Sequence, residues 1–113
     1  MINQIRAIAK QYEINEGSAL AFTVTLYADG TLTVPTSLRY RVDCITTGAT
    51  LTSWTSLTPA STTSVTVTPA ANAIQNNSNF TEVKTITLEA DHGLSGAYTH
   101  ETTWRVKNLQ GIT

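Results

Sequence analysis

The sequence predicts an all-β fold, a single antiparallel β-sandwich of seven to nine strands of the immunoglobulin or fibronectin III type. Apolar side chains recur at every second position, most clearly at Leu20, Phe22, Val24 and Leu26. Successive side chains of a strand point to opposite faces, so this alternation indicates strands with one face on a core. Turn residues separate these segments roughly every 8–12 residues, a spacing typical of sandwiches. A jelly roll is the alternative fold.

The chain of 113 residues has the length of one domain and can bury a core without metal ions or disulfides. Residues 1–10 show no clear alternation, and we expect them to form an N-terminal arm, a short helix or an edge strand. Residues 11–113 are predicted to form the sandwich.

The first half of the sandwich is predicted from alternation and turn residues. Residues 11–16 alternate and predict a first strand, and residues 19–28 predict a long second strand. Asp29-Gly30 favours a type I′ hairpin turn, since both residues adopt positive φ readily. Residues 32–34 then form a short strand that ends at Pro35, which has no N–H to donate.

The next strands are predicted at residues 38–46, 51–57 and 64–68. Trp54 is out of phase within its segment, which a short or bulged strand allows. Residues 70–79 break the alternation and predict one helical turn followed by an Asn-rich loop.

The last two strands are predicted at residues 80–90 and 97–108. The phase of the first slips around Val83–Lys84, so we expect a bulge there. Trp104 and Cys44 lie in the core phase of their strands, and we expect both to be buried.

Composition and motifs indicate a protein that is not an enzyme and needs no cofactor. Seven basic and eight acidic residues give a net charge of −1, which provides no basic surface for nucleic acid. The carboxylates, Glu82 among them, are expected at turns and outward positions as solvated charges. Two histidines and one buried cysteine offer no metal-ligand spacing, so no catalytic or metal site is predicted. No membrane span or signal peptide is visible, which predicts folding in a cytosol.

Arg39, Arg41 and Trp54 are the candidates for a contact surface. Both arginines project from the strand face opposite the core, where an ordinary solvated face is the simpler interpretation. The alternative is a partner interface, at which arginine is enriched. Trp54 is compatible with either core or interface.

Residues 40–108 resemble small structural proteins of tailed bacteriophages, often encoded beside the major capsid protein. The resemblance lies in the order of six segments: Tyr40-Arg41-Val42-Asp43-Cys44, Trp54-Thr55-Ser56-Leu57, Ser64–Thr68, Ala71-Asn72-Ala73-Ile74-Gln75, Glu82–Lys84 and Trp104-Arg105-Val106-Lys107-Asn108-Leu109. It implies an immunoglobulin-like capsid decoration or cement protein, a virion structural protein that binds and stabilises the shell by protein–protein interaction. A tail- or neck-associated module that contacts the host surface is the alternative.

On this interpretation the partner is the major capsid protein, with self-association on the capsid and neither nucleic acid nor membrane as a partner. The protein is expected in the virion, on the capsid surface, and in the host cytoplasm during assembly. The N-terminal segment is the first candidate for the contact, followed by the outer strand face and the Asn-rich loop. The candidate contact residues are therefore Ile2, Ile5, Arg6, Arg39, Arg41, Trp54, Asn76 and Asn77.

Overall fold

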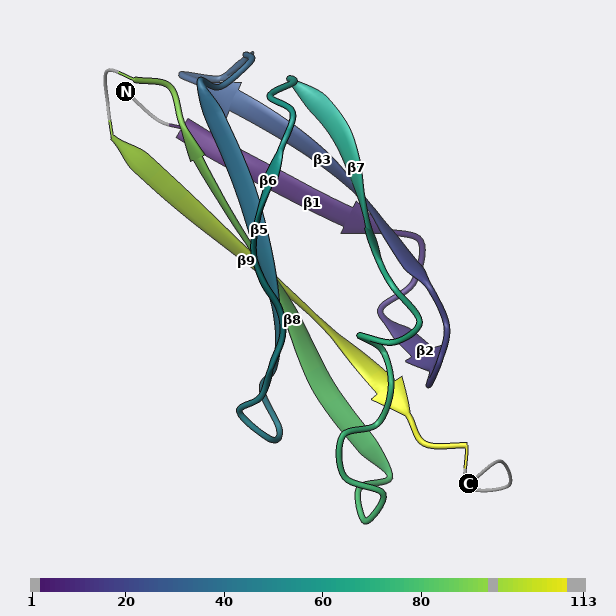
Figure 1. Cartoon of the computed structure of the whole chain (residues 1–113). Coiled ribbons are helices and arrows are strands. Elements are labelled where there is room, and N and C mark those ends of the chain that lie inside the picture. The colour runs from purple at the N-terminus through teal and green to yellow at the C-terminus, as the bar shows by residue number, and fades with distance from the viewer. Residues whose placement is uncertain (1–2, 94–95, 110–113) are drawn as a thin grey trace.

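Alternating burial along the strands produces two β-sheets that pack face to face, so the predicted β-sandwich is confirmed (Figure 1). The computed structural model describes residues 3–93 and 96–109. The four-stranded sheet contains β1 (Asn3–Ala9), β3 (Leu20–Ala28), β4 (Thr31–Leu32) and β7 (Thr62–Val67). The five-stranded sheet has the order β2 (Glu13–Asn15), β9 (Ala97–Lys107), β8 (Thr81–Asp91), β5 (Ser37–Cys44) and β6 (Thr50–Leu57).

The strand order is that of the immunoglobulin and fibronectin III type. β3 lies between β1 and β7 in one sheet, and β8 lies between β9 and β5 in the other, as strands B and F do in that fold. One pairing departs from the antiparallel prediction, because β2 runs parallel to β9. The molecule is elongated, with extents of 50 × 24 × 21 Å.

The core lies between the sheets and is filled by side chains in the predicted phases. Phe22 packs against Trp104 with ring centroids 5.3 Å apart, and both are buried. Cys44 is also buried, as predicted. Such an aromatic pair contributes about 0.5–1.5 kcal/mol beyond its buried area.

Residues 3–9 form an edge strand of the sandwich, which is one of the three alternatives expected for residues 1–10. β1 pairs with β3 from Asn3↔Ala28 to Ala9↔Phe22. Ile5, Ala7 and Ala9 alternate into the core. This alternation is weak in the sequence because two of its three buried residues are alanines.

The bulge expected at Val83–Lys84 is absent from β8, which pairs with β9 without a register shift. Glu82 and Lys84 lie on the core face, in phase with Ile86 and Leu88, and are fully buried. The period-two phase of this segment slips only if the charged residues Glu82 and Lys84 are placed on the outer face of the sheet. Glu82 is therefore not a solvated charge, and this expectation was wrong.

Three turns and loops differ in how well they follow the sequence. Asp29 and Gly30 have φ of 53° and 82°, as the type I′ turn requires. The β5–β6 register shifts between Tyr40 and Val42, which confirms irregularity near Trp54. Residues 70–79 form turns and a loop, and the described residues contain no helix, in particular none that could span a membrane.

Candidate functional site

No group of three or more His, Cys, Asp or Glu side chains that could hold a metal ion occurs within the described residues. His92 stacks on Tyr98, with Nε2 2.6 Å from the phenol oxygen and the ring centroids 5.5 Å apart. His100 contacts the Thr102 hydroxyl at 3.0 Å. Each histidine is therefore engaged with a neighbouring side chain of β9.

Two clusters of charge occur instead, one exposed and one buried, and both involve the five-stranded sheet. The exposed cluster is the Arg–Trp strip, which we define as Arg39, Trp54 and Arg41. Alternation along β5 places both arginines on the outer face, opposite the buried Leu38 and Val42. Two residues of β6, Ser53 and Trp54, lie opposite Arg41 alone, because Tyr40 pairs with Thr55 and Val42 with Thr52. This bulge sets the place of Trp54 beside the arginines.

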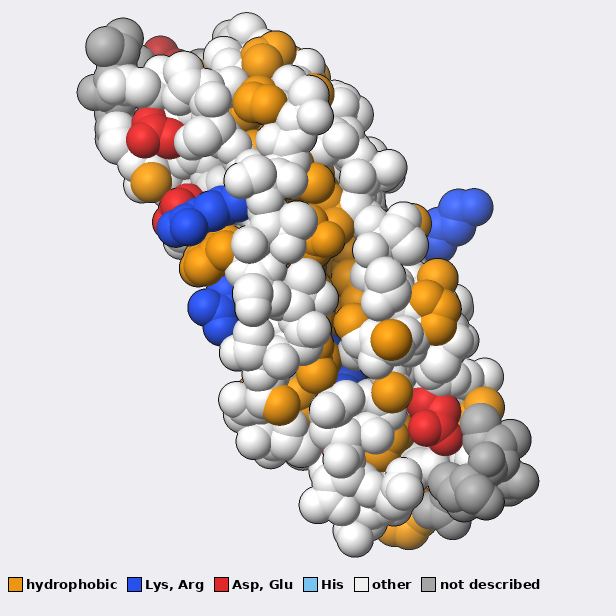
Figure 2. Space-filling view, viewed as in Figure 1, with side chains coloured by type: hydrophobic (Ala, Val, Ile, Leu, Met, Phe, Trp, Pro, Cys, Tyr) orange, Lys and Arg blue, Asp and Glu red, His pale blue; other side chains and the backbone are white. Residues whose placement is uncertain are grey.

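The indole of Trp54 contacts both guanidinium groups. The Arg39 Cζ lies 4.1 Å from the centroid of a Trp54 ring, and the Arg41 Cζ lies 5.6 Å from it. Basic side chains gather at the left margin of Figure 2, with apolar surface between them. Cation–π contacts of this kind contribute about 0.5–1 kcal/mol each at exposed sites.

Acidic neighbours orient the two arginines in different ways. Arg41 donates through Nε and Nη2 to both carboxylate oxygens of Asp43, at 2.8 and 2.7 Å, and through Nη2 to Thr50 at 3.1 Å. Hydrogen bonding from Arg41 lowers the pKa of Asp43, and the same contact raises the pKa of Arg41. Arg39 donates only Nε to Glu89, at 2.8 Å, and no described residue accepts from its terminal nitrogens.

Arg39 therefore presents a guanidinium edge to solvent in a fixed orientation. Arg41 instead uses its guanidinium to bind Asp43 and Thr50 within the same chain. A guanidinium has five N–H donors in a rigid fork, which suits carboxylate groups of a partner. The Arg39 side chain is 44% exposed, so a partner can reach it. Since Trp54 and Glu89 already restrict its rotamers, less conformational entropy is lost on binding.

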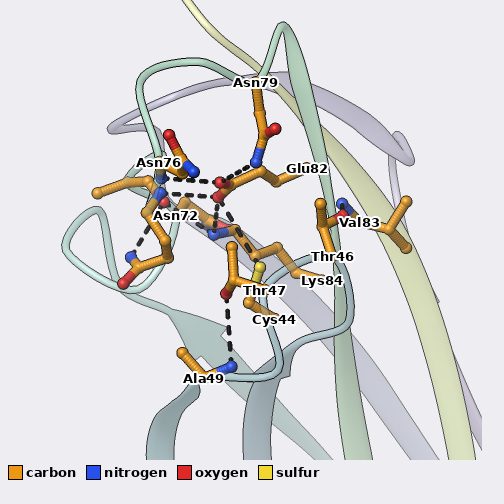
Figure 3. A network of polar contacts seen from close by, with 12 residues as sticks. Cys44, Thr46, Thr47, Ala49, Asn72, Asn76, Asn79, Glu82, Val83 and Lys84 are labelled. Atoms are coloured by element: carbon orange, nitrogen blue, oxygen red, sulfur yellow. Dashed lines mark hydrogen bonds and ion pairs between the residues drawn. The ribbon is translucent and has the colours of Figure 1, made fainter.

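The buried cluster, which we call the loop clamp, joins β8 to the loop at residues 68–80 (Figure 3). Its centre is Glu82, whose carboxylate accepts four hydrogen bonds from the protein. Its donors are Gln75 N at 2.7 Å, Asn76 N at 2.9 Å, Asn79 Nδ2 at 3.0 Å and Lys84 Nζ at 3.0 Å. The Cys44 thiol approaches the same carboxylate at 3.8 Å.

Lys84 completes the loop clamp from the same strand. Its Nζ donates to Glu82 and, at 2.8 Å, to the carbonyl of Ala73 in the loop. Both charged side chains are fully buried. Because an isolated buried charge is very costly, each of the two charges depends on the other and on the loop backbone.

The pKa of Glu82 shows how the loop contributes to this balance. Burial by itself raises the pKa of the carboxyl group. Hydrogen bonds from Gln75, Asn79, Lys84 and Asn76 outweigh it and lower the pKa from 4.5 to about 2. The carboxyl is therefore ionised over the physiological range.

Asn72 fastens the start of the same loop to the core. Its side chain is fully buried, donates from Nδ2 to Ser18 O at 2.8 Å, and accepts from the Trp104 indole at 2.9 Å. The indole N–H of the central core aromatic is thus satisfied by the loop. The loop is anchored at both ends by polar contacts, which holds it in one conformation.

The structure places the predicted contact residues in several separate regions. Arg39 and Arg41 project outward, as the strand alternation predicted, and Trp54 lies beside them. Ile5 is only 3% exposed, because its side chain fills the core, so that side chain offers no exposed contact surface in the free chain. Ile2 lies outside the described residues.

Arg6, Asn76 and Asn77 lie away from the strip. Arg6 is on the outer face of the four-stranded sheet, with its Cζ 5.7 Å from the centroid of Tyr27. Asn76 and Asn77 are exposed in the loop. The Asn76 main-chain N–H belongs to the loop clamp, which the sequence analysis missed; the period-two phase of Glu82 and Lys84 with Ile86 was the available signal.

Comparison of the sequence with protein-family models finds no matching family, and comparison with curated proteins finds no significant relative.

Proposed function

We propose that this chain is a non-enzymatic binding module that attaches to the capsid shell of a tailed bacteriophage and stabilises it, using the Arg–Trp strip as its contact face. The resemblance of residues 40–108 to phage structural proteins supports the choice of partner. The single observation that carries the contact face is the exposed, pre-oriented Arg39 stacked on Trp54.

The strip has the composition of an interaction hot spot. Tryptophan and arginine are the residue types most enriched among side chains that dominate binding energy. Side chains already fixed in the free protein bind at a lower entropic cost. An acidic side chain of the shell protein would pair with the Arg39 fork while its apolar part covers Trp54.

Binding of this kind stabilises the shell by linkage, because a protein that binds only the assembled lattice shifts the equilibrium towards assembly. On a symmetric shell, contacts between neighbouring copies of this chain would add avidity to a modest affinity for each site. The proposal accordingly includes self-association on the capsid, residence in the virion, and a cytoplasmic pool in the host during assembly.

The first test is immunogold electron microscopy on purified particles of the phage that encodes this chain. Label over the head is the expected result. Label confined to the tail or neck would replace the capsid assignment with the tail-associated alternative. Absence of the protein from denatured particles by immunoblot would overturn a virion role.

A second test separates the contact face from the rest of the surface. Co-sedimentation with shells that lack the protein should fall at least about ten-fold in affinity for Trp54→Ala and Arg39→Ala, as expected for hot-spot residues. Tyr27→Ala is the matched control, since it removes the aromatic half of a cation–π pair from the outer face of the opposite sheet. A loss in Tyr27→Ala equal to that of the strip variants would contradict the assignment of the strip.

A further inference from the structure

One stretch of β9 is an open sheet edge, although β9 is not at the end of its sheet. β2 covers β9 only from Arg105 to Lys107, and the rest of that edge has no strand beside it among the described residues. The uncovered part faces β1 of the other sheet, and a groove of about 420 Å³ lies between them. It is lined by residues 3–8 and 98–100. We call this groove the β9 slot.

The hydrogen bonds to β2 show which main-chain groups of β9 point into the slot. Arg105 N donates to Tyr12 O at 2.8 Å, and Lys107 O accepts from Glu16 N at 2.9 Å. Odd-numbered residues of β9 therefore direct their N–H and C=O groups away from β8. By the two-residue repeat of a strand, Thr99 and Glu101 direct theirs into the open edge. No described residue pairs with these groups.

The opposite wall of the slot is the edge of β1 that faces away from β3. Ala7 O accepts from the Thr102 hydroxyl at 3.4 Å, and Ala9 N donates to the Tyr12 hydroxyl at 3.2 Å. These contacts show that the odd-numbered residues of β1 point away from β3. The main-chain groups of Ile5 consequently point towards the slot, as those of Thr99 do from the other wall.

We propose that one extended segment of the shell protein adds as a strand to β9 in this slot, pairing with Thr99 and Glu101. The inference rests on the proposed function for the identity of the partner. Unpaired N–H and C=O groups on an edge are satisfied by the backbone of another extended chain, which is the basis of strand-addition recognition. The occupant lies in line with β2, which already uses the same edge of β9.

Charge specifies the chemistry of the segment. Glu101 is exposed on the outer face of β9, where its carboxylate accepts from the Thr85 hydroxyl at 3.2 Å. A lysine or arginine directly opposite Glu101 would be favourable, and an acidic residue there would be unfavourable. On the inner side the slot borders the core, which Ile5 and Ala7 enter from β1, so a small apolar side chain is expected there. The segment thus has a basic residue facing outward and small apolar residues facing inward.

The decisive variant is Thr99→Pro, which removes one outward N–H without removing a hydrogen bond to β8. Proline is tolerated on strand edges where the N–H faces solvent. Thr66→Pro is the matched control, because Leu26 N donates to Ser61 O and the register therefore turns the Thr66 N–H away from β3. Both variants should unfold at nearly the denaturant concentration of the unmodified chain.

In co-sedimentation with shells, Thr99→Pro should weaken binding about ten-fold, the loss expected when one hydrogen bond at an interface is left unmade. Thr66→Pro should remain within about two-fold of the unmodified chain. Glu101→Lys should weaken binding as well, and more strongly at low salt, where charge repulsion is less screened. Equal binding by the two proline variants would overturn the slot while leaving the proposed function intact.

Amide hydrogen exchange tests the same point without substitution. The N–H groups of Thr99 and Glu101 should exchange at least about ten-fold more slowly in the shell-bound protein than in the free protein. Unchanged exchange on binding would overturn the slot even if Thr99→Pro failed to fold. Failure of the unmodified chain to bind shells would remove the proposed function and the shell segment together. Self-association that protects these amides without shells would identify a second copy as the occupant instead.

Discussion

The loop clamp and the Arg–Trp strip use the same kinds of charged group on the same sheet, but they differ in exposure to water. Lys84 and Glu82 are fully buried, whereas the side chains of Arg39 and Glu89 are 44% and 27% exposed. Burial makes each charge of the clamp dependent on every partner, because water cannot replace one that is lost. In the strip, water replaces lost partners at little cost. The clamp therefore fixes structure, and the strip is free to exchange its contacts with a partner.

The largest effect is expected for Lys84→Met, which leaves the Glu82 charge buried without a cation. We expect the free energy of unfolding to fall by about 3–5 kcal/mol. Arg39→Met makes the same substitution in the exposed pair and should change it by less than about 1 kcal/mol. Urea unfolding monitored by tryptophan fluorescence measures both. Similar losses would show that burial does not distinguish the two regions.

Acid should weaken the loop clamp in a defined pH window. The pKa of Glu82 is about 2 in the folded chain, against 4.5 ordinarily, so the folded state holds the ionised form preferentially. The resulting stability is present above pH 4.5 and is lost as the pH falls towards 2, about 3 kcal/mol in total. Asp43, whose pKa is also lowered, adds a smaller loss in the same direction, because its carboxylate is partly solvated.

Unfolding free energies measured between pH 6 and pH 2 test this expectation. Glu82→Gln should be less stable at pH 6 and should show a weaker dependence on pH below 4.5. A dependence as steep as that of the unmodified chain would mean that another group is responsible.

A smaller loss is expected for Asn79→Ala, which removes one of the four donors to Glu82. A hydrogen bond to a charged group contributes about 1.5–3 kcal/mol, and we expect a loss in that range. Asn77→Ala is the control, since that side chain is exposed and the change should stay within about 0.5 kcal/mol. Faster amide exchange at Gln75 and Asn76 should accompany the loss in Asn79→Ala. Unaltered exchange there would contradict the role of Asn79 in holding the loop.

The smallest effect on stability is expected for Trp54→Ala. Loss of its contact with Arg39 should lower the free energy of unfolding by about 0.5–1 kcal/mol. The Arg39 side chain should become more mobile, which NMR relaxation at Arg39 Nε can measure. A loss above about 2 kcal/mol would place Trp54 in the core and argue against a contact face.

The alternation of apolar residues was sufficient to predict most of the sandwich. The alternate apolar residues of two strands face the core as the pattern indicates, because a water-exposed apolar row would be unfavourable. They are Leu20, Phe22, Val24 and Leu26 of β3 and Leu38, Val42 and Cys44 of β5. For residues 1–10 an edge strand was only one of three alternatives, because Ala7 and Ala9 give a weak pattern, although a small residue suits a strand packed close to the opposite sheet.

The two charge clusters differed in how far the sequence could predict them. The outward direction of Arg39 and Arg41 follows from the strand period alone. The contact with Trp54 depends on a bulge in β6, which period-two counting does not predict. The clamp was missed because a buried Glu82 becomes favourable only when a distant loop supplies N–H donors, and those contacts are tertiary.

The elongated outline has a consequence for how the molecule could lie on a surface. Resting on its long side, it covers a rectangle of 50 by 24 Å, about 1,200 Å², whereas standing on one end it covers about 500 Å². Stable protein interfaces bury about 800 Å² on each partner, so only the orientation with the long side on the surface offers enough area. β1 begins at one end of the molecule and β9 finishes at the other (Figure 1). Labels attached at Asn3, where β1 begins, and at Lys107, where β9 ends, would therefore stand at nearly equal heights above a lattice to which the protein is bound.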